Sequence, residues 1–457
     1  MELRAELLRA VPDERRVSVA ASVLEEHGRD LTYHAPRLPD VVVFPESTEE
    51  VAAVLRLADE RRVPVVPWGA GTSLEGHVIP VAGGISLDLS RLDRILAVRP
   101  AELTATVQAG VLRGALDRAA GEHGLWFPVD PGADASLGGM AATNASGTTT
   151  VRYGGMRAHV LALEAVLPGG AVVRTGSRAV KSSAGYDLGA LLVGSEGTLA
   201  VITELTLRLR GIPERTVAVR AAFPDVEAAC RAAAAVVGAG VLALRVELLD
   251  AATVAAVNAY KGTALEEAPT LLLDFGGTEE GIAGDLEATR ELCELEGAAS
   301  FEAERDREAR ARLWEARHHV LFALVASAPG RAHKTTDACV PVSELADAVR
   351  HAREAAERQG LPAAVVAHAG DGNYHVLFML DTSDEDELRR AEALNAEIVE
   401  HALARGGTCT GEHGIGLGKR GYLAREHGDL LPLMRGVKRL FDPNGIMNPG
   451  KVLPTEP

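Results

Sequence analysis

Short apolar runs of strand length recur along the first 210 residues and are separated by segments with helical spacing. Strands are predicted at residues 41–44, 63–66, 84–89, 95–99, 103–108, 160–167 and 199–209. Helices are predicted at 47–62, where Ser47 can cap the free N–H groups, and at 111–123. Strands and helices do not alternate regularly, so this half is expected to be a mixed α+β unit and not a doubly wound parallel sheet.

The pattern changes after residues 211–213, Gly-Ile-Pro, which form a candidate linker. Strands are predicted beyond it at 217–222, 241–248 and 271–275, with a hairpin formed by 363–368 and 374–380. Helices are predicted at 342–359, 384–405 and 431–441. This second half is expected to be an antiparallel sheet with helices on one face.

Composition and charge exclude several classes of protein. The 457 residues carry a formal net charge of −17, which disfavours nucleic acid and anionic lipid as partners. The four cysteines are scattered without a C-x-x-C pair, so neither an iron–sulfur cluster nor a zinc knuckle is expected. Residues 1–30 lack the apolar core of a signal peptide, and no run of about 18 apolar residues predicts a transmembrane segment.

A glycine-rich segment, Pro-Trp-Gly-Ala-Gly-Thr-Ser at 67–73, directly follows a predicted strand. Such glycines let backbone N–H groups approach a phosphate closely. The segment does not continue as a dinucleotide fingerprint, because the last glycine of that motif is replaced by Leu74, and it lacks the lysine of a P-loop. It is therefore a phosphate-compatible loop of another type, or simply a tight turn.

Two further segments are built from small residues. Residues 131–147 contain almost no large side chains, and Ser136 or Asp134 could cap a short helix there. Such a helix could direct its N-terminus at a pyrophosphate, or it could be a close-packed structural helix. Residues 194–203 form a turn that leads into a strand, which by itself indicates only structure.

The second half carries a candidate metal site. His368 ends one strand of the predicted hairpin and His375 lies near the start of the next, with Gly-Asp-Gly-Asn between them for a sharp reversal. Folding that turn should bring the two imidazoles together. Two histidines and a carboxylate suit a divalent ion with an open coordination position, although two histidines at this spacing are more often structural.

Six motifs together resemble the FAD-linked oxidases of the vanillyl-alcohol oxidase and p-cresol methylhydroxylase superfamily. Three are the glycine-rich segments, and the others are H-A-G-D-G-N-Y-H at 368–375, G-E-H-G-I-G at 411–416 and N-P-G-K at 448–451. The resemblance covers residues 40–453. It is nearest to flavin-type D-lactate dehydrogenases and the D subunit of glycolate oxidase.

The resemblance implies an FAD-binding domain at 1–212, a substrate or cap domain with an antiparallel sheet at 213–410, and a C-terminal segment at 411–457 that returns to the FAD domain and the active site. Thr72 stands where some relatives carry a flavin-linking histidine, so non-covalent FAD is expected. The implied FAD-binding residues are Trp68, Gly69, Ala70, Gly71, Thr72, Ser73, Pro131, Ser136, Gly138, Gly139, Ala142, Thr143, Asn144, Gly147, Glu196, Gly197, Ile202 and Asn448.

The resemblance also implies roles in catalysis. Glu412 would join His368 and His375 as ligands of zinc or manganese, and Arg317 would pair with a substrate carboxylate. Lys334 is a candidate second anion contact, in an uncertain register. His413 would be the general base, a task that an imidazole suits near neutral pH. In an extended chain Glu412 and His413 would point to opposite faces, unless the glycines bend it there.

The expected reaction is FAD-dependent oxidation of a small 2-hydroxy acid, of the D-lactate or glycolate class, to the 2-oxo acid. Alternatives are a D-2-hydroxyglutarate-type dehydrogenase, a non-redox enzyme like alkyl-dihydroxyacetonephosphate synthase, and an FAD-binding subunit of a multi-subunit glycolate oxidase. Leu377 stands where relatives acting on longer diacids carry asparagine, which favours a shorter substrate.

Partners follow from the same resemblance. An electron-acceptor protein, a quinone or an iron–sulfur subunit would receive the electrons, and a homodimer is a further candidate. The expected location is cytoplasmic, or peripheral to the inner membrane through a partner.

Overall fold

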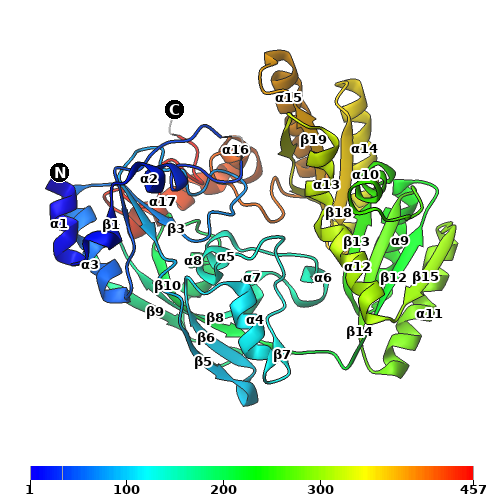
Figure 1. Cartoon of the computed structure of the whole chain (residues 1–457), viewed down its shortest axis with the longest axis horizontal. Coiled ribbons are helices and arrows are strands. Elements are labelled where there is room, and N and C mark those ends of the chain that lie inside the picture. The colour runs from blue at the N-terminus through cyan, green and yellow to red at the C-terminus, as the bar shows by residue number, and fades with distance from the viewer. Residues whose placement is uncertain (1, 33, 456–457) are drawn as a thin grey trace. The chain divides into compact units, whose positions relative to one another are not determined.

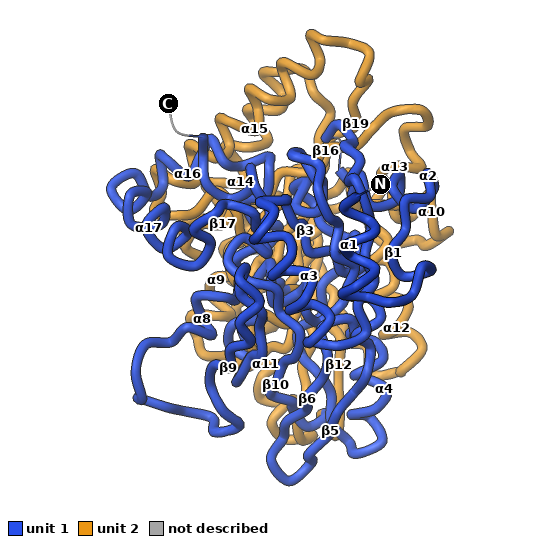
Figure 2. Tube along the Cα trace, turned by 90° about the vertical axis from the view of Figure 1, so that its left-hand side faces the viewer, with its two compact units in different colours: residues 1–146, 154–212, 412–457 blue, residues 147–153, 213–411 orange. Residues whose placement is uncertain are grey.

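The computed structural model describes residues 2–32 and 34–455, which form two compact units. The first unit comprises Met1–Ser146, Gly154–Ile212 and Glu412–Pro457, and the second comprises Gly147–Tyr153 and Pro213–Gly411 (Figure 2). The chain therefore leaves the first unit briefly at residues 147–153, a departure that the sequence pattern does not indicate.

The first unit contains a four-stranded sheet in the order β1 (Val17–Ser18), β2 (Val41–Val43), β4 (Ile85–Asp88), β3 (Val65–Trp68). Strands β1 and β3 of this sheet are labelled in Figure 1. Strands β2, β4 and β3 are parallel, and β1 pairs antiparallel with β2. The strand predicted at 63–66, with its end at Pro67, is instead β3 at Val65–Trp68, so it begins later and includes the proline. Proline is tolerated there because β3 is the last strand of its sheet.

A five-stranded antiparallel sheet completes the framework of the first unit. Its order is β5 (Ile95–Arg99), β6 (Thr104–Gln108), β10 (Val201–Arg208), β8 (Val160–Val166), β9 (Val172–Gly176). Strand β9 was not predicted, because its residues are largely exposed at the edge of the sheet. Residues of both sheets belong to one apolar core, which also includes Ile446 and Met447 from the C-terminal segment.

The helices of the first unit surround these sheets. Ser47 caps α3 (Thr48–Arg61), as predicted, and its Oγ accepts a hydrogen bond from the N–H of Glu50 at 3.3 Å. The other elements are α1 (Glu2–Ala10), α2 (Ala21–Glu26), α4 (Arg113–Gly121), β7 (Leu125–Trp126), α5 (Leu137–Thr143), α7 (Met156–His159), α8 (Leu188–Leu192), β11 (Arg210–Gly211), α16 (Arg420–His427) and α17 (Leu431–Phe441).

The second unit is built on an antiparallel sheet of eight strands. Its order is β15 (Ser300–Glu304), β12 (Arg215–Ala222), β14 (Thr270–Gly277), β13 (Ala243–Leu249), β18 (Ala363–His368), β19 (Asn373–Leu380), β16 (Ala332–Thr335), with β17 (Ala338–Cys339) also paired to β19. The predicted hairpin is confirmed, since β18 and β19 pair in register with His368 opposite Asn373.

Helices cover both faces of this sheet, so the expectation of helices on one face is wrong. One apolar core lies under α9 (Val226–Gly238), α11 (Glu279–Leu295), α14 (Leu345–Arg358) and α15 (Glu385–Ala404). A second core lies under α10 (Ala251–Lys261), α12 (Arg307–His318) and α13 (Val320–Ser327). Strands buried on both faces read as continuous apolar runs, which do not reveal how many faces are covered. The short helix α6 (Thr150–Tyr153) also belongs to this unit.

Among the described residues, no helix is both long and apolar enough to cross a bilayer.

Candidate active site

The three glycine-rich segments converge within the first unit. The N–H of Gly194 donates to the carbonyl of Ala141 at 2.9 Å, and that of Glu196 donates to Ala142 at 2.8 Å, so the third segment is bonded to the second. Gly69 joins the first segment to the second, because a Cβ on it would lie 2.4 Å from Oγ of Ser136. Segments far apart in sequence thus form one surface of backbone and small side chains.

Glycine is required at two positions of this surface by close approach. Gly71 has φ +67° and a Cβ there would lie 2.5 Å from Cζ2 of Trp68. The N–H of Gly138 donates to the carbonyl of Ala109 at 2.8 Å, and a Cβ on Gly138 would lie 2.5 Å from Cβ of Ala109. At both positions the close neighbour belongs to the protein itself, so glycine lets the backbone of these segments pack tightly.

Ser136, and not Asp134, caps the helix of the second segment. Its Oγ accepts from the N–H of Gly139 at 3.4 Å, at the start of α5. Asp134 instead accepts from the N–H of Gly114 at 2.8 Å. At the other end of α5, Thr143 Oγ1 donates to the carbonyl of Gly139 and Asn144 has φ +51°.

Glu196 and Asn448 tie the C-terminal segment to the glycine-rich surface. The Glu196 carboxylate accepts from the N–H groups of Ile415 at 2.7 Å and Gly416 at 2.8 Å. The Asn448 side chain donates to the carbonyls of Glu196 at 2.7 Å and His77 at 3.1 Å. Glu196 and Asn448, both predicted to bind FAD, therefore also hold segments of the first unit together through hydrogen bonds.

The other predicted FAD residues all belong to the first unit, except Gly147. Ser73 Oγ donates to Asp30 at 3.0 Å, and Ile202 is buried in the core. Gly147 lies in the second unit, where its N–H donates to Oγ1 of Thr150 at 3.0 Å. The residue before it, Ser146, belongs to the first unit.

In the second unit, the hairpin brings His368 and His375 together as expected. Their ring centroids are 5.6 Å apart, their planes meet at 89°, and both residues are buried. Nδ1 of His368 donates to Oε1 of Glu247 at 2.8 Å, and Nδ1 of His375 donates to the carbonyl of Thr336 at 3.0 Å. The acceptors fix the proton on Nδ1 in each ring, so Nε2 is the nitrogen that can bind a metal.

Arg317 reaches the same face of the sheet from α12. Its Nε and Nη2 lie 2.8 Å and 2.6 Å from Oε2 of Glu247. Trp314 lies about one turn earlier on that helix, with its ring 4.6 Å from the guanidinium carbon of Arg245. Arg310 lies about two turns earlier and pairs with Asp274 at 3.9 Å. These contacts hold α12 against β13 and β14 and direct Arg317 towards the histidine pair.

Lys334 does not join this face. It pairs with Phe378, which belongs to the core on the opposite side of the sheet, and its ammonium forms an ion pair with Glu392 of α15. Directly opposite residues of an antiparallel pair share a face, so a shift of one residue decides where a side chain points. Thr335, the next residue, pairs with Leu377 on the face of His375. The placement of Lys334 as a second anion contact is corrected accordingly.

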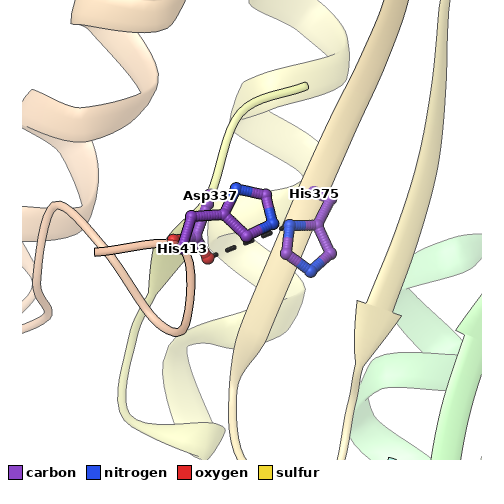
Figure 3. A group of neighbouring side chains, drawn as sticks. All are labelled: Asp337, His375 and His413. Carbon is purple, nitrogen blue, oxygen red and sulfur yellow. Dashed lines mark ion pairs between the residues drawn. The ribbon is translucent and has the colours of Figure 1, made fainter. Parts of the chain in front are cut away.

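Asp337 joins the histidine strand to the segment that follows α15. Its Oδ1 lies 3.9 Å from Nδ1 of His375 (Figure 3) and accepts from Asn373 at 2.8 Å. Its Oδ2 accepts from Thr410 Oγ1 at 2.7 Å and from the N–H of Gly411 at 3.1 Å. Asp337 is 1% exposed, so a buried carboxylate links β19 to the segment at residues 410–411 within the second unit.

Glu412 and His413 begin the C-terminal part of the first unit, and His413 is also labelled in Figure 3. They do not lie in a strand: the chain bends there, and Gly414 has φ +83°. Nε2 of His413 lies 4.0 Å from Oε1 of Glu412, so the two side chains do not point to opposite faces. Within this unit, Ser146 Oγ donates to Oε2 of Glu412 at 3.1 Å.

Sequence reasoning missed Glu247 and Asp337. A signal for Glu247 was present, since Arg245 and Glu247 interrupt an apolar strand at alternate positions and must therefore share one face. Asp337 gave no such signal, because its partners Asn373, Thr410 and Gly411 are distant in sequence.

Comparison with known proteins identifies both halves of the chain. Residues 39–176 match the family described as FAD binding domain, and residues 212–452 match that described as FAD linked oxidases, C-terminal domain. The chain is 43% identical to a probable mitochondrial D-lactate dehydrogenase of Danio rerio, over 97% of this chain and 90% of that protein. It is 36% identical to glycolate oxidase subunit GlcD of Bacillus subtilis, over 93% of this chain and 91% of that protein.

The fold agrees with these matches. The structure of p-cresol methylhydroxylase superposes with a TM-score of 0.80 at 17% identity, covering 99% of this chain and 96% of that one. The expected fold class, an FAD-binding part combined with an antiparallel-sheet cap, is confirmed. The chain belongs to the FAD-linked oxidases and is an FAD-dependent oxidoreductase.

Proposed function

We propose that the chain oxidises a small 2-hydroxy acid, of the D-lactate or glycolate class, to the corresponding 2-oxo acid. The names of its relatives support this substrate class. The observation that carries the proposal is the buried pair of His368 and His375, with Arg317 on the same face of the sheet. His368 and Arg317 share Glu247 as a partner. An anion-binding guanidinium next to two imidazoles suits a substrate that carries a carboxylate and an oxygen on adjacent carbons.

The residues of the first unit fit FAD. A Cβ at Gly69, Gly71 or Gly138 would meet a neighbouring protein atom within 2.5 Å, so these glycines let the segments pack closely together. Glycine-rich backbone of this kind supplies N–H groups that suit a pyrophosphate. Thr72 offers no imidazole for a covalent link, so the cofactor is held non-covalently. When bound, FAD supplies the acceptor for two electrons, and residues 1–212 form its domain.

The histidine pair fits a divalent metal, zinc or manganese. Both rings are buried, and both have Nδ1 fixed by an acceptor, which orients Nε2 as the ligand atom. Glu412 is the proposed third ligand. It is joined by a peptide bond to Gly411, whose N–H is bonded to Asp337 beside His375. When bound, such a metal supplies a Lewis acid that polarises the substrate oxygen.

The protein's own residues divide the chemistry between them. Arg317 directs two N–H groups to Glu247 and uses its remaining N–H groups to bind the substrate carboxylate. His413 takes the proton from the 2-hydroxyl as general base. The C–H bond at C2 breaks with loss of a hydride as the oxygen becomes a carbonyl. One proton and one hydride thus leave the substrate, which balances its conversion to a 2-oxo acid.

Electrons then leave to an external acceptor. An electron-acceptor protein, a quinone or an iron–sulfur subunit can take this role, and the relative named as a subunit favours a complex. The four cysteines, at positions 230, 293, 339 and 409, form no C-x-x-C pair that would suit an iron–sulfur cluster. A cytoplasmic location, with attachment to the inner membrane through a partner, and a homodimeric state are parts of the same proposal.

Leu377 favours a short substrate over a dicarboxylic one. It lies two residues after His375 on the same face of β19, is 5% exposed, and belongs to the apolar core with Trp314. An apolar side chain there offers no hydrogen bond to a second carboxylate. A non-redox ether synthase is disfavoured because Glu412-His413-Gly414 stands in place of its histidine cluster.

A panel of D- and L-2-hydroxy acids tests the proposal, with turnover followed by a dye acceptor. The purified chain should reduce the dye with D-lactate or glycolate, and more slowly with D-2-hydroxyglutarate. Reduction by none of the acids would reject the proposed substrate class. Activity only in the presence of another subunit would support the role of a complex component.

A further inference from the structure

Glu247 occupies a position between two residues of the proposed site. It lies on β13, directly opposite His368 of the neighbouring strand β18, so both side chains point to the same face of the sheet. Arg317 reaches that face from α12. The Glu247 side chain is 1% exposed, so its charge is removed from water and needs compensation by the protein.

Each oxygen of this carboxylate serves one partner. Oε1 accepts from Nδ1 of His368 at 2.8 Å, and Oε2 lies 2.8 Å from Nε and 2.6 Å from Nη2 of Arg317. The first contact fixes the tautomer and the orientation of the imidazole. The second fixes the guanidinium plane, because two of its donors converge on one oxygen. A single side chain therefore sets the spacing between the histidine and the arginine.

A purely structural role for Glu247 would be to attach α12 to the sheet. That attachment is already made elsewhere, since Asp274 of β14 pairs with Arg310 of α12 at 3.9 Å, and Arg245 stacks on Trp314. Asp274 also lies 3.6 Å from Arg245. Glu247 and Asp274 are therefore two buried carboxylates of the same sheet. Glu247 differs from Asp274 in its hydrogen bond to His368.

We propose that Glu247 is a positioning residue that holds His368 ready to bind the metal and Arg317 ready to bind the substrate carboxylate. The inference rests on the proposed function, in which His368 is a metal ligand and Arg317 binds substrate. Carboxylates bonded to the second nitrogen of a metal-binding histidine raise its basicity and fix its orientation. Glu247 does this for one ligand and at the same time supplies the counter-charge for the substrate-binding arginine.

The test uses the FAD-loaded protein and measures metal affinity without turnover. Glu247→Gln keeps the shape of the side chain but loses its charge, and Asp274→Asn is the matched control in the same sheet. Mn²⁺ binding is followed by the loss of its free electron paramagnetic resonance signal, and Zn²⁺ binding by competition with a chelating dye. Glu247→Gln should weaken binding about 10- to 100-fold, whereas Asp274→Asn should change it less than about 2-fold.

Arg317→Gln separates the two tasks of Glu247. It should leave Mn²⁺ affinity close to that of the wild type, because the contact of Glu247 with His368 remains, while raising KM for D-lactate. Unchanged metal affinity in Glu247→Gln, or an equal loss in Asp274→Asn with retained FAD, would overturn the inference. A wild-type protein that binds neither Mn²⁺ nor Zn²⁺ would instead reject the metal site of the proposed function. If Glu247→Gln does not fold, Glu247→Asp, which keeps the charge, should retain more Mn²⁺ affinity than Glu247→Ala.

Discussion

His77 and Glu196 form a buried ion pair in the first unit, with 3.2 Å between Nε2 of the imidazole and Oε2 of the carboxylate. The same carboxylate accepts hydrogen bonds from Ile415 and Gly416. Burial opposes the charge on His77, but Glu196 raises the pKa of the imidazole above its usual value. Burial likewise opposes the charge on Glu196, but His77 and the two backbone donors lower the pKa of the carboxyl.

The ion pair of His77 and Glu196 is expected to stabilise the fold most strongly within a limited range of pH. Its contribution to the free energy of unfolding is complete below the ordinary histidine pKa of 6.5 and above the ordinary glutamate pKa of 4.5. It is lost as the pH rises through the raised pKa of His77, or falls through the lowered pKa of Glu196. Urea unfolding of Glu196→Gln against the wild type should show a deficit of about 3–5 kcal/mol that is largest inside this range of pH.

The exposed pair of Arg178 and Glu102 provides the control for this measurement. Glu102→Gln should lower the free energy of unfolding by less than about 1 kcal/mol, because solvent screens that pair. A deficit in Glu196→Gln that does not vary with pH between 4 and 9 would contradict the account of a buried, ionised pair.

Gly138→Ala is expected to impair FAD binding, because the new methyl group would lie 2.5 Å from Cβ of Ala109 and 2.9 Å from its carbonyl oxygen. The backbone of α5 must then shift, at a cost of about 1–3 kcal/mol. The ratio of flavin to protein absorbance after purification measures the effect. Gly132→Ala is the control, since its Cβ meets nothing within 4 Å. Equal flavin content in the two variants would argue against the close approach at Gly138.

Leu377→Asn is expected to shift the substrate preference towards dicarboxylic acids. An amide two residues after His375 offers hydrogen bonds to a second carboxylate, and it removes apolar contacts that favour a short substrate. The ratio of kcat/KM for D-2-hydroxyglutarate to that for D-lactate should rise about 10-fold. Met379→Gln, one repeat further along the same face, should leave this ratio unchanged. A ratio unaffected in Leu377→Asn would remove Leu377 from the specificity argument.

Asp337→Asn is expected to lower turnover without loss of FAD. The carboxylate accepts from Asn373, Thr410 and Gly411, and an amide cannot accept on its nitrogen, so at least one of these bonds is lost. The segment that leads to Glu412 and His413 is then held less firmly. We expect kcat/KM to fall about 10-fold or more, as for other supports of metal ligands. Thr410→Val, which removes one donor, should show a smaller loss. Full turnover in Asp337→Asn would show that the hydrogen bonds of the Asp337 carboxylate are not needed for catalysis.

Local sequence patterns predicted those parts of the fold that depend on near neighbours. Alternating apolar residues and the Gly-Asp-Gly-Asn turn predicted the β18–β19 hairpin and hence the meeting of His368 with His375. The cap at Ser47 followed from one side chain and the helix after it. Strand β9 was missed because an exposed edge strand carries no apolar pattern.

Features that depend on distant partners could not be predicted. Glu247 meets His368 across 121 positions of the chain, and only the order of strands in the sheet brings the two together. Lys334 was misplaced because a shift of one residue along β16 reverses the face of a side chain. Burial of both faces of the eight-stranded sheet was not predicted for a related reason. An apolar run of residues does not show whether one or both faces of its strand are covered by helices.

Single-turnover reduction of the flavin by D-lactate, followed without oxygen, tests the central claim most directly. The FAD-loaded protein should bleach rapidly with its metal in place, at least about 100-fold more slowly after the metal is removed by a chelator, and rapidly again when Mn²⁺ is restored. His375→Ala should retain FAD but bleach slowly in all three states. Flavin that bleaches equally fast with and without metal, or that no 2-hydroxy acid reduces, would contradict the account.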